Sequence, residues 1–284
     1  AAQHQNYANY TVNQALLVTV PVPQNDFNGD VATTTGNVRL LLQPLPRLGT
    51  EFFYRLRDRD YDADRNGYLY VRGDGSDQPG QPLTVYNTNH DLTSQTAGLE
   101  ALYRLPLRSK LSAEYAYEQV ERRNAPVETT EEDRYTVKYR IQPWSNFTSS
   151  LHLQYADRAA DTYDWAQDYY ALLDTQLINA TPDDQRYTNH PLLMKYYMAN
   201  RERWESGADF SFLPEARWNL NLNLLWREDD YDQSSLGLTE TQWERAHFSA
   251  SFAATDTLSY SVYTGVDRYR GDQGSRAFRG GQEK

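Results

Sequence analysis

The chain has 284 residues, a formal net charge of −11 at pH 7 and no cysteine. The lack of cysteine excludes disulfides, thiolate zinc sites, iron–sulfur centres and covalently attached c-type haem in this chain, and the negative charge argues against nucleic acid as a partner. The chain carries 23 Tyr and 6 Trp, residue types that favour surfaces where apolar and wet zones meet. No run approaches 18 apolar residues, which excludes a transmembrane helix but leaves a membrane-spanning β-barrel open.

Alternation of apolar and polar residues with a period of two predicts about ten β-strands. In the clearest run, the even-numbered positions from Trp218 to Trp226 are all apolar, and Asn219, Asn221 and Asn223 stand between them. Eight steps of about 3.3 Å give a strand of roughly 27 Å, which spans about 20 Å when tilted by about 40°, near the apolar band of an outer-membrane barrel. The predicted strands are residues 31–43, 49–59, 94–105, 110–122, 132–142, 147–158, 204–213, 217–228, 242–252 and 257–269.

The connections between the predicted strands fall into two length classes. The short turns are residues 44–48, 106–109, 143–146, 214–217 and 253–256. The longer loops are residues 60–93, 123–131, 159–203 and 229–241. Short turns at one end and long loops at the other are typical of a bacterial outer-membrane barrel, whereas a soluble β-sandwich has no reason to separate them. The sequence therefore predicts an all-β fold, a transmembrane antiparallel up-and-down β-barrel in the bacterial outer membrane, with residues 1–284 in one domain.

The same alternation divides the strand residues into two predicted faces. A mid-plane Arg or Lys against lipid costs about 2–4 kcal/mol, so the charged positions are assigned to the lumen, in contact with water or a polar partner. The predicted lumen-facing residues are Arg55, Arg57, Glu100, Arg104, Glu114, Glu118, Arg134, Lys138, Arg140, His152, Asp209, Asn219, Asn221, Asn223, Arg227 and His247. The predicted lipid-facing residues are Tyr54, Tyr115, Tyr139, Leu151, Phe210, Trp218, Leu220, Leu222, Leu224, Trp226 and Phe248.

An acidic run follows the second predicted strand. Its residues Asp62, Asp64 and Asn66 have the spacing that opens an EF-hand loop, but Gly73 stands where the closing Glu is needed, so an EF-hand is excluded. A solvated acidic loop is the default interpretation. The alternative is a loose Ca²⁺ site on an extracellular loop, formed by Asp60, Asp62, Asp64 and Asn66.

The sequence contains no H-E-x-x-H, G-x-S-x-G, Walker A or G-x-G-x-x-G motif. We therefore predict no catalytic residue, no other metal site and no enzymatic activity. A barrel hydrolase that uses His152 or His247 with a nearby Asp is the remaining catalytic alternative.

Several stretches resemble the MtrB/PioB family of outer-membrane barrels that associate with decahaem cytochromes. The strongest are Lys195-Tyr-Tyr-Met-Ala-Asn-Arg201 and Asp229-Asp-Tyr-Asp-Gln-Ser-Ser-Leu-Gly-Leu-Thr239. The others lie within residues 25–44, 54–60, 111–122 and 128–133. The resemblance covers most of the chain, and its specificity comes from the order and spacing of the fragments.

The resemblance implies a porin-like sleeve that holds a periplasmic decahaem c-type cytochrome inside the barrel, next to an extracellular multihaem cytochrome, so that electrons cross the outer membrane. The haem would be carried by the partner, and none would be bound covalently here. Family barrels have well over twenty strands, so about ten strands imply a partial chain, the C-terminal part of a larger barrel. The alternative is a small stand-alone porin or adhesin with acidic extracellular loops. Two tyrosine pairs in the longest loop, Tyr169–Tyr170 and Tyr196–Tyr197, are predicted either as partner contacts or as rim aromatics.

Overall fold

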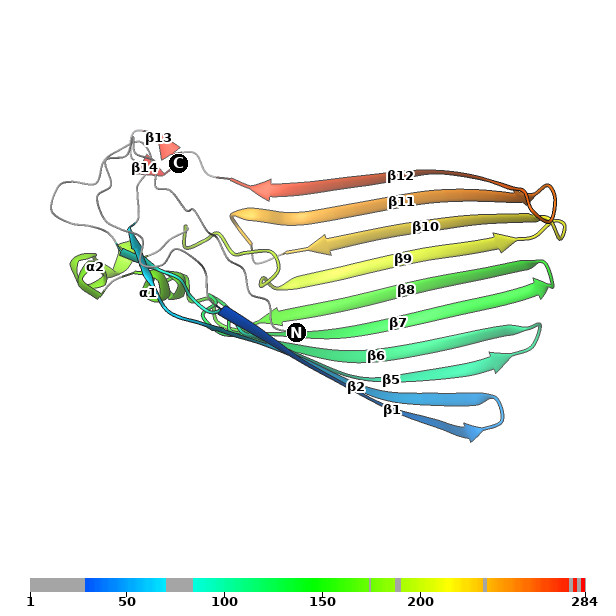
Figure 1. Cartoon of the computed structure of the whole chain (residues 1–284), viewed down its shortest axis with the longest axis horizontal. Helices are drawn as coiled ribbons and strands as arrows, with labels where there is room; N and C mark the ends of the chain where they lie inside the picture. Colours follow the sequence, from blue (N-terminus) through cyan, green and yellow to red (C-terminus); the bar gives the residue numbers. More distant parts are fainter. Residues whose placement is uncertain are drawn as a thin grey trace.

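The computed structural model describes residues 29–69, 84–173, 175–186, 190–231, 234–275, 278–279 and 282–283. These residues form one antiparallel sheet of ten strands in the order β1-β2-β5-β6-β7-β8-β9-β10-β11-β12, shown in Figure 1. The ten strands are β1 (Gly29–Leu45), β2 (Leu48–Ala63), β5 (Leu92–Leu105), β6 (Ser109–Arg122), β7 (Thr129–Trp144), β8 (Phe147–Ala160), β9 (Arg201–Phe212), β10 (Trp218–Asp230), β11 (Gly237–Ala253) and β12 (Ser259–Gly274). Along the chain, each strand of this sheet pairs with the next one. The two short strands between β2 and β5 form a separate hairpin and do not interrupt that order. The predicted up-and-down order is therefore confirmed.

The ten predicted strands are all present, but most extend further than the alternation indicated, chiefly at the end that carries the long loops. For example, β7 begins at Thr129 rather than at residue 132, and β12 continues to Gly274 rather than ending at residue 269. Backbone hydrogen bonds do not depend on which side chains are apolar, so the pairing continues past the point where alternation stops. Apolar alternation therefore located the middle of each strand better than its ends.

The predicted long loops contain secondary structure that the sequence analysis did not identify. Between β2 and β5 lies a hairpin of β3 (Gly67–Leu69) and β4 (Thr84–Tyr86). Between β8 and β9 lie α1 (Gln167–Leu172), α2 (Thr175–Ala180) and a 3₁₀ turn (Asp183–Gln185). Two further short strands, β13 (Phe278–Arg279) and β14 (Gln282–Glu283), pair with each other. Among the residues that the structure describes, no helix combines the length and apolar character needed to cross a membrane.

The two ends of the sheet differ as predicted: every short turn lies at one end and every long connection at the other (Figure 1). We call these the turn end and the loop end. The turn between β5 and β6 places Leu107 at φ 57° and Arg108 at φ 52°. A turn with positive φ at both central residues has a backbone twist that matches the right-handed twist of the two strands it joins. Asn and Gly adopt positive φ at much lower cost than Leu and Arg.

The sheet is open in the described part of the chain, because β1 and β12 form its two edges and do not pair with each other. Side chains on both edges are highly exposed, among them Val38 at 65% and Tyr263 at 87%. The buried apolar cluster lies at the loop end, where Ala125, Val127 and Met198 pack together. This small cluster holds the loops over β6–β8 and fixes the position of the residues described next.

Candidate functional site

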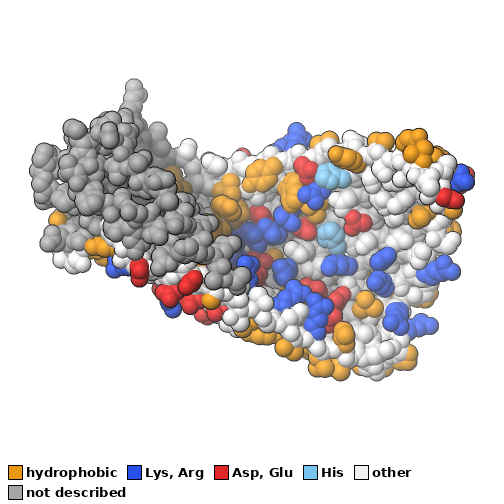
Figure 2. Space-filling view, in the orientation of Figure 1, with side chains coloured by type: hydrophobic (Ala, Val, Ile, Leu, Met, Phe, Trp, Pro, Cys, Tyr) orange, Lys and Arg blue, Asp and Glu red, His pale blue; other side chains and the backbone are white. Residues whose placement is uncertain are grey.

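The strand register assigns each side chain to one face, because residues directly opposite each other in neighbouring strands point to the same side. All sixteen residues predicted to face the lumen lie on one face, which we call the polar face. All eleven residues predicted to face lipid lie on the opposite, apolar face. Figure 2 shows Lys and Arg side chains interspersed with Asp, Glu and His over the middle of the sheet. The environment that each face meets stays a prediction.

Aromatic pairs occur on the apolar face near both ends of the strands. At the turn end the rings of Trp218 and Phe252 lie 4.6 Å apart. Towards the loop end Tyr155 and Trp204 lie 4.8 Å apart, and near the middle of β6 and β7 Tyr115 and Tyr135 lie 5.2 Å apart. Two aromatic levels that enclose an apolar band are characteristic of a strand that crosses a bilayer.

A row of carboxylates lies immediately beyond the loop-end aromatic level, on the same face. Its members are direct neighbours across five strands: Asp133, Asp157, Glu202, Asp230 and Glu240. Like charges placed directly opposite each other are unfavourable unless water screens them. We therefore expect this row to lie in water, beyond the apolar band.

Three rings on the polar face lie flat against the sheet, each above a glycine in the neighbouring strand. A Cβ atom on Gly207 would lie 2.1 Å from Cε1 of His152, and one on Gly265 would lie 2.3 Å from Cδ2 of His247. The pairs are Phe53 over Gly98, His152 over Gly207 and His247 over Gly265. The sequence analysis missed these pairs; the available signal was a glycine inside a strand, which often marks a close approach.

Both histidines of the predicted lumen set contact carboxylates. Nε2 of His152 lies 3.2 Å from Oε1 of Glu205, and Nε2 of His247 lies 2.7 Å from Oδ2 of Asp267. The same aspartate accepts a hydrogen bond of 2.9 Å from Nε of Arg245. Each imidazole is therefore held between a glycine below and a carboxylate beside it.

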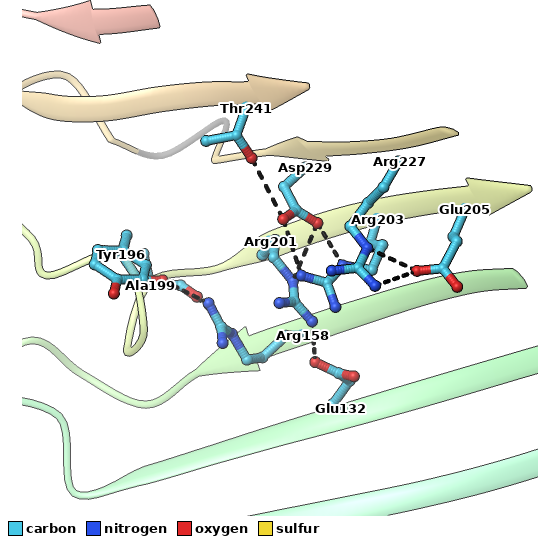
Figure 3. Close-up of polar contacts among 10 residues, drawn as sticks. All are labelled: Glu132, Arg158, Tyr196, Ala199, Arg201, Arg203, Glu205, Arg227, Asp229 and Thr241. Carbon is cyan, nitrogen blue, oxygen red and sulfur yellow. Dashed lines mark hydrogen bonds and ion pairs between the residues drawn. The ribbon is translucent and has the colours of Figure 1, made fainter. Parts of the chain in front are cut away.

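An arginine cluster occupies the loop end of the polar face (Figure 3). Arg203 donates two hydrogen bonds to the buried carboxylate of Asp229, at 2.5 and 2.9 Å. Arg227 donates to Glu205 at 2.6 Å, and Arg201 pairs with Glu132. Bidentate and charge-assisted contacts of this kind are stronger than neutral hydrogen bonds and fix the side chains in place.

Arg158 links this cluster to the loops. Its guanidinium donates to the carbonyl oxygens of Ala199, at 2.9 Å, and Tyr196, at 2.7 Å. Tyr231 follows directly after β10, and burial together with the nearby carboxylate of Asp229 raises the pKa of its phenol. Tyr231 therefore stays a neutral phenol at pH 7 and adds no negative charge to the cluster.

The cluster borders a cavity of about 410 Å³. Its walls come from the loop that precedes β9, through Tyr196 and Tyr197, and from β10–β12 and the connection after β10. Of the two tyrosine pairs singled out in the sequence, only Tyr196–Tyr197 lines this cavity. The other pair, Tyr169–Tyr170, lies in α1. The two stretches with the strongest family resemblance, residues 195–201 and 229–239, thus meet at one cavity, which their separation in sequence did not reveal.

A second group of cations lies at the turn end of the polar face. Arg104, Lys110 and Arg140 are direct neighbours across β5, β6 and β7, and Lys138 lies on the same face. None of these four side chains makes a hydrogen bond or ion pair with any residue that the structure describes. We call Arg104, Lys110 and Arg140 the basic row.

The residues of the predicted calcium site are not gathered around one point. Asp60 and Asp62 lie in β2, whereas Asp64 and Asn66 lie in the connection to β3. Asn66 and Asn87 both donate to the backbone carbonyl of Asp64, at 3.2 and 2.9 Å. Within the described ranges, no group of three or more His, Asp or Glu side chains has the arrangement of a metal site. Calcium binding stays a prediction.

The open sheet, with one apolar face between aromatic levels, one charged face and connections separated by length, has the architecture of an outer-membrane β-barrel wall. A family model described as "Putative outer membrane beta-barrel porin, MtrB/PioB" matches residues 1–283. The chain belongs to this family of outer-membrane proteins, as the sequence resemblance predicted.

One relative is the outer membrane protein MtrB of Shewanella baltica (strain OS185), which is 28% identical over 243 residues. The match covers 85% of this chain and 32% of the relative, so the chain spans about a third of that protein's length. Among solved structures, OmpT of Vibrio cholerae has a TM-score of 0.39 at 5% identity over 88% of this chain and 90% of OmpT. Its variant lacking loop L8 also scores 0.39, at 6% identity, over 86% and 95% of the two chains. Scores this low do not by themselves establish a shared fold.

Proposed function

We propose that this chain forms part of the wall of a larger outer-membrane barrel that encloses a multihaem c-type cytochrome, so that electrons cross the outer membrane. The observation that carries the proposal is the polar face, which is charged along its whole length and belongs to a sheet that does not close on itself. A barrel of about ten strands would be filled largely by its own side chains. An open sheet that continues into further strands leaves room for a protein.

The edges of the sheet support the larger barrel. The outer edges of β1 and β12 have no strand partner among the described residues, and unpaired strand edges are not stable within a bilayer. The chain also spans only about a third of its relative's length. We therefore propose that further strands pair with β1 and β12 to complete the wall.

The flat rings and paired charges of the polar face support a smooth inner wall. Folding His152 and His247 down over glycines keeps them from projecting into the interior. Their Nε2 atoms are engaged by Glu205 and Asp267, which favours a structural role over the hydrolase alternative. The proposed sleeve binds and insulates; it performs no catalysis itself, and haem belongs to the enclosed partner.

The direct test is a visible absorption spectrum of the detergent-extracted native complex, first oxidised and then reduced with dithionite. The proposal predicts the spectrum of c-type haem, with many haems for each copy of this protein. Because the chain has no cysteine to attach such haem, the signal would have to come from a second protein. A haem-free complex would refute the proposal and favour the porin or adhesin alternative.

That alternative makes a different prediction in liposomes. A small porin would admit sugars and other small solutes without any partner, whereas a barrel occupied by a cytochrome would conduct electrons and admit few solutes. Entrapped methyl viologen, reduced inside the liposome, reports electron transfer to an external ferric salt. Electron transfer that requires the cytochrome, with little solute leakage, would support the sleeve.

A further inference from the structure

The cavity beside the arginine cluster contains hydrogen-bond donors that the protein does not use. The Arg201 side chain is only 9% exposed, and its Nε–H has no hydrogen-bond partner in the described structure. Oδ1 of Asp229 lies 4.0 Å from this atom, which is too far for a hydrogen bond. A buried donor without a partner is costly, so an acceptor at this N–H would be favourable. Because the nitrogen itself is covered, an acceptor in the cavity reaches it only after a small movement of the side chains around it.

The charges in contact around the cavity do not cancel. Four arginines line it: Arg158, Arg201, Arg203 and Arg227. Three carboxylates contact them, from Glu132, Glu205 and Asp229. Four positive charges against three negative ones leave one positive charge, which matches a ligand with a single negative charge.

Arg158 carries the unmatched charge. Its two hydrogen bonds go to the backbone carbonyl oxygens of Tyr196 and Ala199, which are neutral. A guanidinium has five N–H donors, so Arg158 keeps donors available for an anion while the two carbonyls hold it in place. In Figure 3 its guanidinium lies between the Tyr196–Ala199 backbone and Arg201.

The remaining walls are aromatic. Tyr196, Tyr197, Tyr231, Trp243 and Tyr269 all line the cavity, and the Arg227 guanidinium lies 5.1 Å from the centre of the Trp243 ring. Such walls favour a flat or apolar group attached to the anion. The cavity volume of about 410 Å³ admits a group the size of an aromatic acid or an acidic side chain with its neighbour.

We propose that this cavity is a binding site for a monovalent carboxylate, held by Arg158 and the Nε–H of Arg201. The carboxylate can come from a protein lying against the polar face or from a free organic acid. The site depends on the geometry of the loop end alone and does not require that the barrel hold a cytochrome. Failure of one proposal therefore leaves the other standing.

The test is isothermal titration of the detergent-purified native protein with sodium benzoate, an aromatic monocarboxylate. We expect saturable binding of one benzoate per protein, with a dissociation constant on the order of 1 mM. Benzamide has the same shape without the charge and should not bind. Acetyl-Glu-Tyr-amide, with one side-chain carboxylate, should compete with benzoate; tighter binding of the dipeptide indicates a protein source, and tighter binding of benzoate indicates a free acid.

Two variants assign the binding to the two arginines. Arg158→Gln removes the unmatched charge, and Arg201→Lys keeps a charge near Glu132 but removes the Nε–H. Each should weaken benzoate binding by about tenfold or more. Arg217→Gln, in the turn before β10 at the other end of the sheet, is the control and should bind benzoate as the unaltered protein does. Benzamide binding equal to benzoate, no saturable binding, or unchanged binding in both folded variants would overturn the proposal.

Discussion

The two ends of the polar face handle positive charge in opposite ways. At the loop end, Arg203 and Arg227 each contact a carboxylate on the neighbouring strand, and Arg201 contacts Glu132 two strands away. Asp229 is buried among them. At the turn end, the basic row places three cations side by side with no carboxylate in contact among the described residues. Both groups of cations lie on the same face of the same sheet. They differ in how deeply they are buried, not in the face that they occupy.

This difference separates charges that hold the fold from charges that remain available to other molecules. A buried ion pair must be complete, because one partner left alone in a low-dielectric site is costly. Exposed cations beside each other repel weakly and are screened by water and salt. The loop end is therefore a rigid structure with one unmatched charge, and the turn end is a surface that a negatively charged partner can neutralise.

The largest expected effect comes from breaking the buried network. Asp229→Ala removes the bidentate partner of the half-buried Arg203 and takes a nearby negative charge from the buried Arg201. We expect the free energy of unfolding to fall by about 3–5 kcal/mol. Urea unfolding of the protein in detergent micelles, followed by tryptophan fluorescence, measures the change.

The matched control lies near the turn end. Asp209 also accepts a hydrogen bond across the sheet, from Asn223 at 2.6 Å, but that contact is exposed. Asp209→Ala should cost about 1 kcal/mol or less. Equal losses in the two variants would show that burial does not distinguish the two ends.

The sequence predicted the repeating parts of this molecule and missed the parts made by contacts between distant residues. Alternation along the chain was enough to place Arg104 and Arg227 on one face and Trp218 on the other, because period two is a local property of a strand. The Asp229–Arg203 contact joins residues 26 positions apart, and Arg158 reaches Ala199 across 41. No local pattern encodes such pairs.

Strand ends and glycine contacts were unpredictable for related reasons. Past residue 269, β12 carries Arg270 and Asp272, so alternation of apolar residues stops while backbone pairing continues. The sequence analysis assigned no role to Gly207, although the register shows that it accommodates the ring of His152. In both cases the deciding partner lies on the neighbouring strand.

The glycine beneath His152 gives the next largest effect. In Gly207→Ala, the new Cβ would lie 2.1 Å from Cε1 of the imidazole, so the ring must swing away from the sheet and from Glu205. We expect a loss of about 1–3 kcal/mol in the free energy of unfolding. The control is Gly49→Ala on β2, where a Cβ meets nothing within 4 Å and little change should follow. If the two substitutions behave alike, the flat ring does not contribute to packing.

The turn between β5 and β6 offers a change in the opposite direction. Leu107 and Arg108 both have positive φ, which strains non-glycine residues. The double substitution Leu107→Asn with Arg108→Gly supplies the residues that this geometry favours, and should raise the free energy of unfolding by about 1 kcal/mol. Urea unfolding in the same detergent measures it, and a loss of stability would mean that Leu107 or Arg108 makes a contact outside the described sheet.

The smallest effect on stability is expected in the basic row, where the comparison of the two ends is sharpest. Lys110 stands between Arg104 and Arg140, so Lys110→Gln removes repulsion on both sides and breaks no ion pair. The free energy of unfolding should change by no more than about 0.5 kcal/mol. If the polar face surrounds a cytochrome, however, the salt concentration that releases haem protein from the complex should fall, because a charge available to the partner has been removed.

The control is Arg217→Gln, outside the strands, which should alter neither the free energy of unfolding nor the salt concentration that releases the haem protein. A stability loss of more than about 1 kcal/mol in Lys110→Gln would place the basic row with the loop-end network, as a structural feature of the sheet.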